Sequence, residues 1–497
     1  MELKPIIGLE LHVQLSTQTK LFSHPPTFVA SRVTVGAAPN QHVSPFDAAY
    51  PGTLPTSLAL DSEVQRISAF DRKHYSYPDL PAGYQITQKY HPIAKGGSVT
   101  LTEHVGLPDP VKVRVDQIQM EQDTGKSLVS ITQPGCVDVD LNRAGTALLE
   151  IVFLPDLSKA EEAVALVRHL QGLLRSLGVS SVNMEDGSLR CDVNISMQPV
   201  NGIIQGLRNG RCEIKNMNSL KQLSQAISYE VKRQRNLLEA GEVVEPETRD
   251  FDVKSQQTVV LRSKETSPEY RYMPEPDIPP LHISLDEVNR AKESLPELPL
   301  QAFNRLKTVH GLSTQQARSL LDAPGALSYF STMMKQGSPP RMAYNWYGLI
   351  WILSLNECRM MTELMGLLNR HGLFWNQTPI QPERLTGLIQ CIETQRITGK
   401  SAKKILRMMM DGDEKSAQDI ASGLGLLLPP PSSTSSEEEV QRICNGILEA
   451  NPEKVQEYKK GKKRIMGWMV AQALGQAPQG SLDPRRVSGY LSEALKK

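Results

Sequence analysis

The chain contains 497 residues, 39% of them hydrophobic and 22% charged, and its 55 basic and 54 acidic residues give a formal net charge of +1. A chain of this length has room for two or three domains, each with its own core. The balanced charge gives no overall sign of nucleic-acid binding, so any contact with RNA has to be local.

The cysteines and the apolar segments exclude further classes. Six cysteines are dispersed, at positions 136, 191, 212, 358, 391 and 444, without a Cys-x-x-Cys pair. This spacing argues against a zinc ribbon and a disulfide framework, and it suits a reducing compartment. No apolar run is long enough to span a membrane, so we expect no membrane partner. Residues 1–15 are typical of a strand rather than of a signal or transit peptide.

The first predicted element is a strand at residues 6–15, in which apolar and polar residues alternate. Successive side chains of a strand point to opposite faces, so Glu10, His12 and Gln14 share one face. A histidine in a strand is more often structural than a ligand. Because Glu10 lies on the same face, His12 is nevertheless a candidate for a functional site.

Acidic side chains recur on two later strand-like segments. Gln119, Glu121 and Asp123 share a face in residues 118–126, and Glu150 stands alone in the apolar run 147–153. Burying a lone glutamate is costly unless it is paired or binds a cation. An oxygen-rich cluster of this kind suits Mg²⁺, which is usually held by one or two carboxylates and substrate phosphates.

Residues 189–196 and 212–215 form two more alternating segments. Arg190, Asp192 and Asn194 share the polar face of the first, and Glu213 and Lys215 share that of the second. Two such strands resemble the floor of a binding site, although a half-exposed sheet that meets water gives the same pattern. Two acidic residues stay ambiguous, because Asp123 and Glu213 could be structural partners of Lys126 and Lys215.

The helical elements divide the rest of the chain. We predict helices at 158–177, opened by Ser158, and at 219–240, closed by Gly241. The proline-rich segment 273–280 is interpreted as the exit from the first domain. From about residue 285 the pattern is helical, and residues 426–437 form a low-complexity loop that we interpret as flexible. The fold class is therefore α+β, with a mixed β-rich domain (1–290), an all-α helical domain (291–385) and a small helical tail domain (386–497).

Two short motifs imitate a phosphate-binding loop without completing it. Gly125-Lys-Ser127 and Gly399-Lys-Ser401 lack the required glycine five residues earlier, where Met120 and Thr394 stand. Any nucleotide site in this chain therefore has to be built in another way, from acidic metal ligands and scattered cations.

An ordered series of motifs between residue 6 and about residue 280 carries a family resemblance. The motifs are Gly8-Leu-Glu-Leu-His12, Asp79-Leu-Pro-Ala-Gly-Tyr-Gln85, Met184-Glu-Asp-Gly-Ser-Leu-Arg-Cys-Asp-Val-Asn-Ile-Ser196, Glu213-Ile-Lys-Asn216 and Tyr270-Arg-Tyr-Met-Pro-Glu-Pro-Asp277. The chain resembles the B subunit of the aspartyl/glutamyl-tRNA amidotransferases. The resemblance implies a cradle-like catalytic domain and a YqeY-like tail domain. It also implies an ATP-dependent carbon–nitrogen ligase that phosphorylates the carboxyl group of misacylated Glu-tRNA(Gln) or Asp-tRNA(Asn) and amidates it with ammonia.

The resemblance also implies roles for particular residues. The expected Mg²⁺ ligands are Glu10, His12, Glu121 and Glu150. Asp192 and Asn194 would face the metal or the phosphates, while Arg190 and Lys215 would offset developing negative charge. Lys73, Tyr84 and Gln85 are expected substrate contacts, and Glu213 lies with Lys215 beside an expected ammonia channel. The tail would contact tRNA through the basic run Lys454, Lys459, Lys460, Lys462, Lys463 and Arg464.

Partners and compartment follow from what the chain lacks. No amidase signature is present, so ammonia is expected from a separate amidase-type glutaminase (the A subunit of the family), held by a small bridging protein (the C subunit). Many bacterial members carry a four-cysteine zinc site, whereas the matching positions here hold Ser23, Pro25, Ser44 and Asp47, so we expect no zinc. This cysteine-free form and the motif Arg72-Lys-His-Tyr75 favour the mitochondrial matrix over a bacterial cytoplasm. The alternatives are a stand-alone amide ligase and a non-catalytic tRNA-binding subunit.

Overall fold

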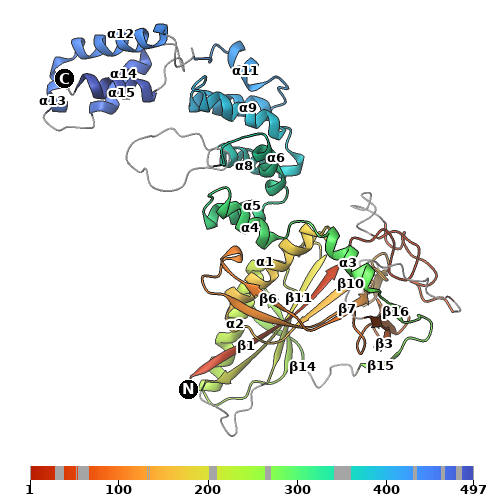
Figure 1. The fold of residues 1–497 in the computed structure, drawn as a ribbon. Helices are drawn as coiled ribbons and strands as arrows, with labels where there is room; N and C mark the ends of the chain where they lie inside the picture. The colour runs from red at the N-terminus through yellow and green to blue at the C-terminus, as the bar shows by residue number, and fades with distance from the viewer. Residues whose placement is uncertain are drawn as a thin grey trace. The chain divides into compact units, whose positions relative to one another are not determined.

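The computed structural model describes residues 2–27, 38–51, 53, 66–130, 133, 135–200, 210–263, 270–340, 360–428, 434–459, 465–476 and 484–495. They belong to two compact units, Met1–Ala302 and Phe303–Lys497 (Figure 1). The first unit combines a large sheet with helices and the second is helical, which confirms the predicted α+β class. The strands are β1 Leu3–Gln14, β2 Ile67–Ser68, β3 Asp71–His74, β4 Tyr84–Thr87, β5 Ala94–Lys95, β6 Ser98–Leu101, β7 Val111–Gln122, β8 Lys126–Val129, β9 Val137–Asp140, β10 Ala147–Phe153, β11 Leu189–Pro199, β12 Cys212–Lys215, β13 Glu247–Asp252, β14 Gln257–Ser263, β15 Arg271–Pro274 and β16 Leu281–His282.

A nine-stranded sheet organises the first unit. Its order is β14-β13-β12-β11-β1-β10-β7-β5, with β6 also paired to β7. Neighbouring strands are antiparallel except β12 and β13, which are parallel. The N-terminal strand β1 lies in the middle of the sheet, so side chains from distant parts of the sequence flank it on both sides.

Two helices cover one face of this sheet, α1 (Ala160–Ser176) and α2 (Leu220–Glu239) (Figure 1). The inward residues of β1, such as Leu9 and Leu11, are fully buried in one cluster with Leu166 and Ile227 of the helices. Both helices lie within the predicted ranges. Helix α1 begins after Lys159 rather than after Ser158. The Glu162 carboxylate accepts hydrogen bonds from the backbone N–H groups of Ser158 and Lys159, which fixes the start of the helix. With one face covered by helices, the polar residues of the strands lie on the other face.

A three-stranded sheet, β15-β3-β4, lies beside the large sheet, with β4 in contact with β7. A separate apolar cluster that includes Phe70, Ile86 and Met120 joins the two sheets. The segment 273–280 was interpreted from the sequence as the exit from the first domain. In the structure it is also part of that domain. Its first residues end β15, and its buried Glu275 receives two hydrogen bonds from Arg72 of β3.

The second unit consists of helices. Together with the helices after β16, their bounds are α3 Leu285–Ser294, α4 Pro299–Thr308, α5 Thr314–Asp322, α6 Ala326–Lys335, α8 Met360–His371, α9 Pro382–Glu393, α10 Gly399–Met410, α11 Ala417–Gly423, α12 Thr434–Ala450, α13 Pro452–Lys459, α14 Ile465–Gly475 and α15 Pro484–Ala494. Ser284 and Ser313 cap α3 and α5, where each side-chain oxygen accepts a hydrogen bond from a backbone N–H group. The predicted loop at 426–437 is partly wrong, since α12 begins at Thr434.

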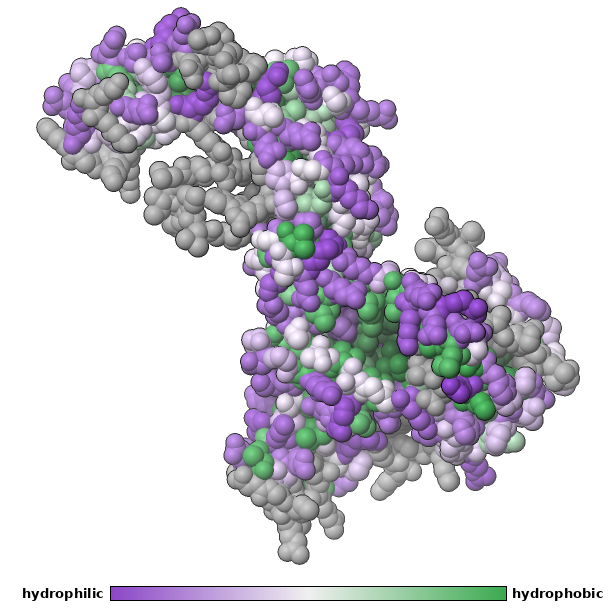
Figure 2. All heavy atoms as spheres, in the orientation of Figure 1, coloured by the Kyte–Doolittle hydropathy of each residue, from purple (hydrophilic) through white to green (hydrophobic). Residues whose placement is uncertain are grey.

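Two apolar clusters hold this unit, one spanning Phe303–Ala421 and one spanning Val440–Leu495. The first contains Leu364 and Leu385 together with Leu388 and Ile405. The proposed boundary between residues 385 and 386 stays a prediction. Among the described helices, none has the length and apolarity needed to cross a bilayer, and the visible face of this unit is largely hydrophilic (Figure 2).

Candidate functional site

Strand register brings the predicted site residues into rows across the open face of the large sheet. His12 of β1 lies opposite Arg190 of β11 on one side and Glu150 of β10 on the other. Glu150 in turn lies opposite Gln119 of β7. Side chains directly opposite each other in antiparallel strands are in contact distance. The register therefore assembles one row from four strands.

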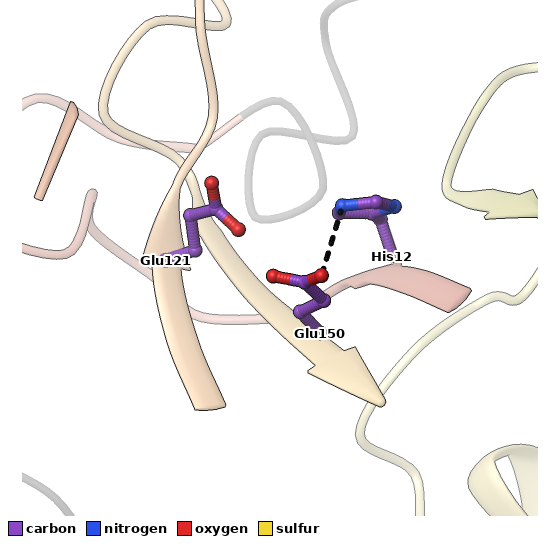
Figure 3. A group of neighbouring side chains, drawn as sticks. All are labelled: His12, Glu121 and Glu150. Carbon is purple, nitrogen blue, oxygen red and sulfur yellow. Dashed lines mark ion pairs between the residues drawn. The ribbon is translucent and has the colours of Figure 1, made fainter. Parts of the chain in front are cut away.

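His12, Glu121 and Glu150 gather into one cluster (Figure 3). One potential ligand atom from each lies within 4.8 Å of the others, and His12 Nε2 is 3.9 Å from Glu150 Oε1. The Glu121 side chain is only 2% exposed. These are three of the four predicted metal ligands, and they come from three different strands.

The two carboxylates of this cluster are buried and repel each other. Burial and the nearby Glu121 carboxylate raise the pKa of Glu150 to about 7, although His12 and Lys73 oppose the shift. Gln119 donates a hydrogen bond to Glu150. Glu121 Oε2 is buried and receives no hydrogen bond from the described residues. A cation or a proton between the carboxylates would relieve both effects.

This donor set fits a divalent cation. An imidazole nitrogen and two carboxylates can ligate one ion, and one of these carboxylates, that of Glu121, has a buried oxygen without a hydrogen bond from the described residues. Mg²⁺ is compatible because it needs few protein carboxylates, although its preferred ligands are oxygens. Within the described part of the chain this is the one group with such geometry.

The fourth predicted ligand, Glu10, lies outside this group. It is on the same face of β1 but accepts a hydrogen bond from Asn194 Nδ2 at 3.0 Å. Burial, and then the negative charges of Glu150, Asp192 and Glu213, raise its pKa. Glu10 therefore links the metal-ligand cluster to a second group of charged residues.

Lys215 organises that second group. Its ammonium forms ion pairs with Asp192 and, at 3.2 Å, with Glu213. Burial opposes protonation of Lys215, but the two carboxylates outweigh it and raise its pKa. Glu213 therefore pairs with Lys215, which is the structural role that the sequence analysis had left open for it.

Asp123 has a different partner from the predicted Lys126. Its Oδ2 is 2.8 Å from Arg190 NH2 and 3.6 Å from Arg143 Nε. Arg190 Nε is buried and makes no hydrogen bond to a described residue. One carboxylate thus holds two guanidinium groups beside the acidic cluster, so these three side chains together carry one net positive charge. Sequence reasoning missed Arg143, which has no strand pattern around it.

Lys73 connects the cluster to the small sheet. Its Nζ lies 3.5 Å from Glu121 Oε1, and although burial opposes it, the Glu121 and Glu150 charges raise the Lys73 pKa. Gln85, directly opposite Lys73 on β4, is buried between the Tyr75 hydroxyl and the Gln122 carbonyl oxygen. Tyr84 belongs to the other face of this sheet, where its ring lies under the Arg72 guanidinium at 4.3 Å. Lys73 is therefore the predicted contact that points at the acidic cluster.

Of the four positions matched to a zinc site, Asp47 forms a buried ion pair with Lys20, which is not one of them. Lys20 Nζ is 3.0 Å from Asp47 Oδ2, and Ser23 donates a hydrogen bond of 2.9 Å to the same carboxylate. Structural zinc requires thiolate or imidazole ligands, and these residues do not fit it. At the tail, Lys459 is exposed at the end of α13, whereas Lys460, Lys462, Lys463 and Arg464 lie outside the described residues.

The arrangement of these side chains indicates a class of binding site. An open sheet face that combines a histidine, two buried carboxylates and anchored cations is suited to binding a divalent cation and phosphate groups. Residues 5–289 match the model of the GatB/GatE catalytic domain, and residues 328–495 match that of the GatB domain.

Full-length relatives agree with these two matches. The chain is 35% identical to the mitochondrial B subunit of the glutamyl-tRNA(Gln) amidotransferase from Naegleria gruberi, over 99% of this chain and 94% of that protein. It is 37% identical to the B subunit of the aspartyl/glutamyl-tRNA(Asn/Gln) amidotransferase from Pseudomonas paraeruginosa over the whole of both chains. With the counterpart from Ehrlichia chaffeensis it shares 38% identity, over 99% of this chain and 97% of that one. The chain belongs to the GatB family, the B subunits of tRNA amidotransferases.

Proposed function

We propose that this chain catalyses the phosphorylation and amidation steps of a tRNA-dependent amidotransferase. The substrate is a misacylated tRNA, Glu-tRNA(Gln) or Asp-tRNA(Asn), and the products are the amidated tRNA, ADP and phosphate. The observation that carries the proposal is the cluster of His12, Glu121 and Glu150 inside the region matched to the catalytic domain. A stand-alone ligase or a non-catalytic tRNA-binding subunit is not favoured by relatives that match along the whole chain.

The chemistry needs an activated carboxyl group, because a carboxylate does not react with ammonia. An oxygen of the substrate carboxylate attacks the γ-phosphorus of ATP, and the bond to the leaving ADP oxygen breaks. Ammonia then attacks the acyl carbon, the carbon–oxygen bond to phosphate breaks, and the proton that the nitrogen loses ends on the departing phosphate. Phosphoryl transfer mainly requires positioning and neutralisation of charge.

The residues on the sheet face can divide these tasks. His12, Glu121 and Glu150 would hold Mg²⁺, which offsets phosphate charge when bound. Arg190 and Lys73 lie beside this group, and their positive charges can contact the phosphoryl group that is transferred.

The Lys215 group has the composition needed to guide ammonia. Glu10, Asp192 and Glu213 supply carboxylates that can hold an ammonium ion and accept its proton before attack. We assign the ammonia path to this group, with ammonia supplied by the amidase-type glutaminase and the complex held together by the small bridging protein. A closed wall between this group and the glutaminase in a complex would contradict the assignment.

The proposed catalytic role is tested by amidation of radiolabelled Glu-tRNA(Gln) by the purified chain with ATP, Mg²⁺ and ammonium chloride. We expect labelled Gln-tRNA(Gln) from the wild type and a loss of about 100-fold or more in His12→Ala, because the cation loses one of three ligands. His371→Ala, an exposed histidine of α8, is the control and should leave the rate unchanged. No product from the wild type, even with the glutaminase and the bridging protein added, would replace this proposal by the tRNA-binding alternative.

The compartment is a separate proposal. Mitochondrial and bacterial proteins both occur among the relatives. On the cysteine-free positions and the motif around Lys73 we assign the chain to the mitochondrial matrix, and fractionation of cells that express it tests this.

A further inference from the structure

Five tyrosines form a series that passes beside Lys73, and the reaction chemistry does not account for them. We call Tyr75, Tyr77, Tyr90, Tyr270 and Tyr272 the tyrosine group. Tyr272 of β15 lies directly opposite Lys73 of β3. Because side chains alternate along a strand, Tyr270 and Tyr75 lie on the same face as this pair. The face that carries Lys73 toward Glu121 therefore also carries tyrosines.

The rings form a continuous series. Tyr77 contacts Tyr75 with ring centroids 5.6 Å apart, and Tyr75 contacts Tyr270 at 5.5 Å. Tyr270 contacts Tyr272 at 6.4 Å, and Tyr272 contacts Tyr90 at 6.3 Å. Neighbouring rings meet at 64° to 78° rather than face to face. Such edge contacts do not cover both faces of each ring, so ring surface stays available to a ligand.

The group is more exposed than an aromatic core. Tyr77 is 45% exposed, Tyr90 54% and Tyr270 39%. Cations accompany the rings, with Lys73 Nζ 4.9 Å from the Tyr270 ring centre and Lys89 Nζ 5.7 Å from that of Tyr272. Exposed aromatic rings interleaved with lysines are the surface that proteins use to bind single-stranded nucleic acid, by stacking on bases and attracting phosphates.

The position of the group identifies which part of a nucleic acid it would bind. Lys73 touches both Tyr270 and, at 3.5 Å, Glu121 of the metal-ligand cluster. A strand stacked on the tyrosines would therefore lie next to the proposed reaction site. In an aminoacyl-tRNA the amino acid is attached to the unpaired 3′ end. Resting on the proposed function, we propose that the tyrosine group binds the unpaired 3′ nucleotides of the tRNA by stacking.

The test is a double-mutant cycle between the protein and the tRNA. Dissociation constants are measured for uncharged tRNA(Gln) and for the same tRNA lacking its unpaired 3′ nucleotides, with the chain in complex with the glutaminase and the bridging protein. For the wild type we expect truncation to weaken binding about tenfold or more, the loss of one stacked base. Tyr270→Ala and Tyr90→Ala should bind both tRNAs with nearly the same affinity. Tyr270→Phe keeps the ring, and Tyr229→Ala changes a tyrosine of the helix layer, so both should keep the full effect of truncation.

Each outcome separates this proposal from the proposed function. If the alanine variants keep the wild-type response to truncation, the tyrosine group does not bind the 3′ end, whatever the variants do to overall affinity. A folding defect is recognised because it weakens both tRNAs equally, and Tyr90→Ala, at an exposed ring, provides the second test. Wild-type amidation with ammonium is measured in parallel. Amidation with an unchanged truncation effect in the variants overturns only the stacking proposal, whereas no amidation overturns the proposed function.

Discussion

The Glu150 carboxylate has an acidic neighbour and little water around it. Its pKa is raised from 4.5 to about 7, first by burial and then by Glu121. The folded protein therefore holds a proton on Glu150 at pH values at which the unfolded chain has released it. For a carboxyl group with a raised pKa, the free energy of unfolding falls as the pH rises from about 4.5 to about 7.

We predict that this fall amounts to at most about 3 kcal/mol in metal-free protein and is absent in Glu150→Gln. Urea unfolding in chelator at pH 5 and pH 7.5 measures it, and Glu161→Gln, at an exposed position of α1, is the control. Mg²⁺ at pH 7.5 should raise the melting temperature of the wild type and not that of Glu150→Gln. An equal response of both proteins to Mg²⁺ would remove Glu150 from the metal site.

At the scale of elements, a buried carboxylate fixes helix α2 to the edge of the sheet. Glu230 is fully buried and accepts hydrogen bonds from Arg233, Gln234 and Thr258, the last of which belongs to β14. Burial opposes ionisation of Glu230, but these hydrogen bonds outweigh it and lower its pKa. A carboxyl group with a lowered pKa stabilises the fold above its unfolded pKa, and this contribution is lost as the pH falls.

We predict that Glu230→Gln lowers the free energy of unfolding at pH 7 by about 3 kcal/mol, because it leaves Arg233 and Arg249 with one fewer buried charge partner. Glu239→Gln, at the exposed end of the same helix, should change it by less than about 0.5 kcal/mol. Denaturant unfolding at pH 7 and pH 4 checks both values, and the difference between Glu230→Gln and wild type should shrink at the lower pH.

Elements also show how far sequence reasoning reaches. Alternation within a segment identifies a strand and its polar face, as it does for Arg190, Asp192 and Asn194. It carries no information on which strand lies alongside. The pairing of Asp123 with Arg190, rather than with nearby Lys126, follows from contacts between residues 67 positions apart. The tyrosine group was missed for the same reason, since β3 and β15 are distant in the sequence.

At the scale of the whole molecule, the basic run from Lys454 to Arg464 is the predicted tRNA contact of the tail. We predict that replacing Lys459, Lys460, Lys462, Lys463 and Arg464 by glutamine weakens tRNA binding and lowers the slope of log affinity against log salt concentration by about 3 to 5. Amidation at saturating tRNA should keep its maximal rate. Binding measured at several salt concentrations tests this, with Lys112→Gln of the first unit as the control. An unchanged slope would exclude the run from the interface.

The central place of β1 has a consequence for biosynthesis. Its neighbours in the sheet are β10 and β11, which end at Phe153 and Pro199. At roughly 5 to 20 residues per second, the ribosome takes about 10 to 40 s to deliver the second neighbour. Until β10 has been made β1 has neither of its neighbours, and until β11 has been made it has only one of them. His12, among the first residues made, can therefore reach its place in the site only after most of the first unit has emerged.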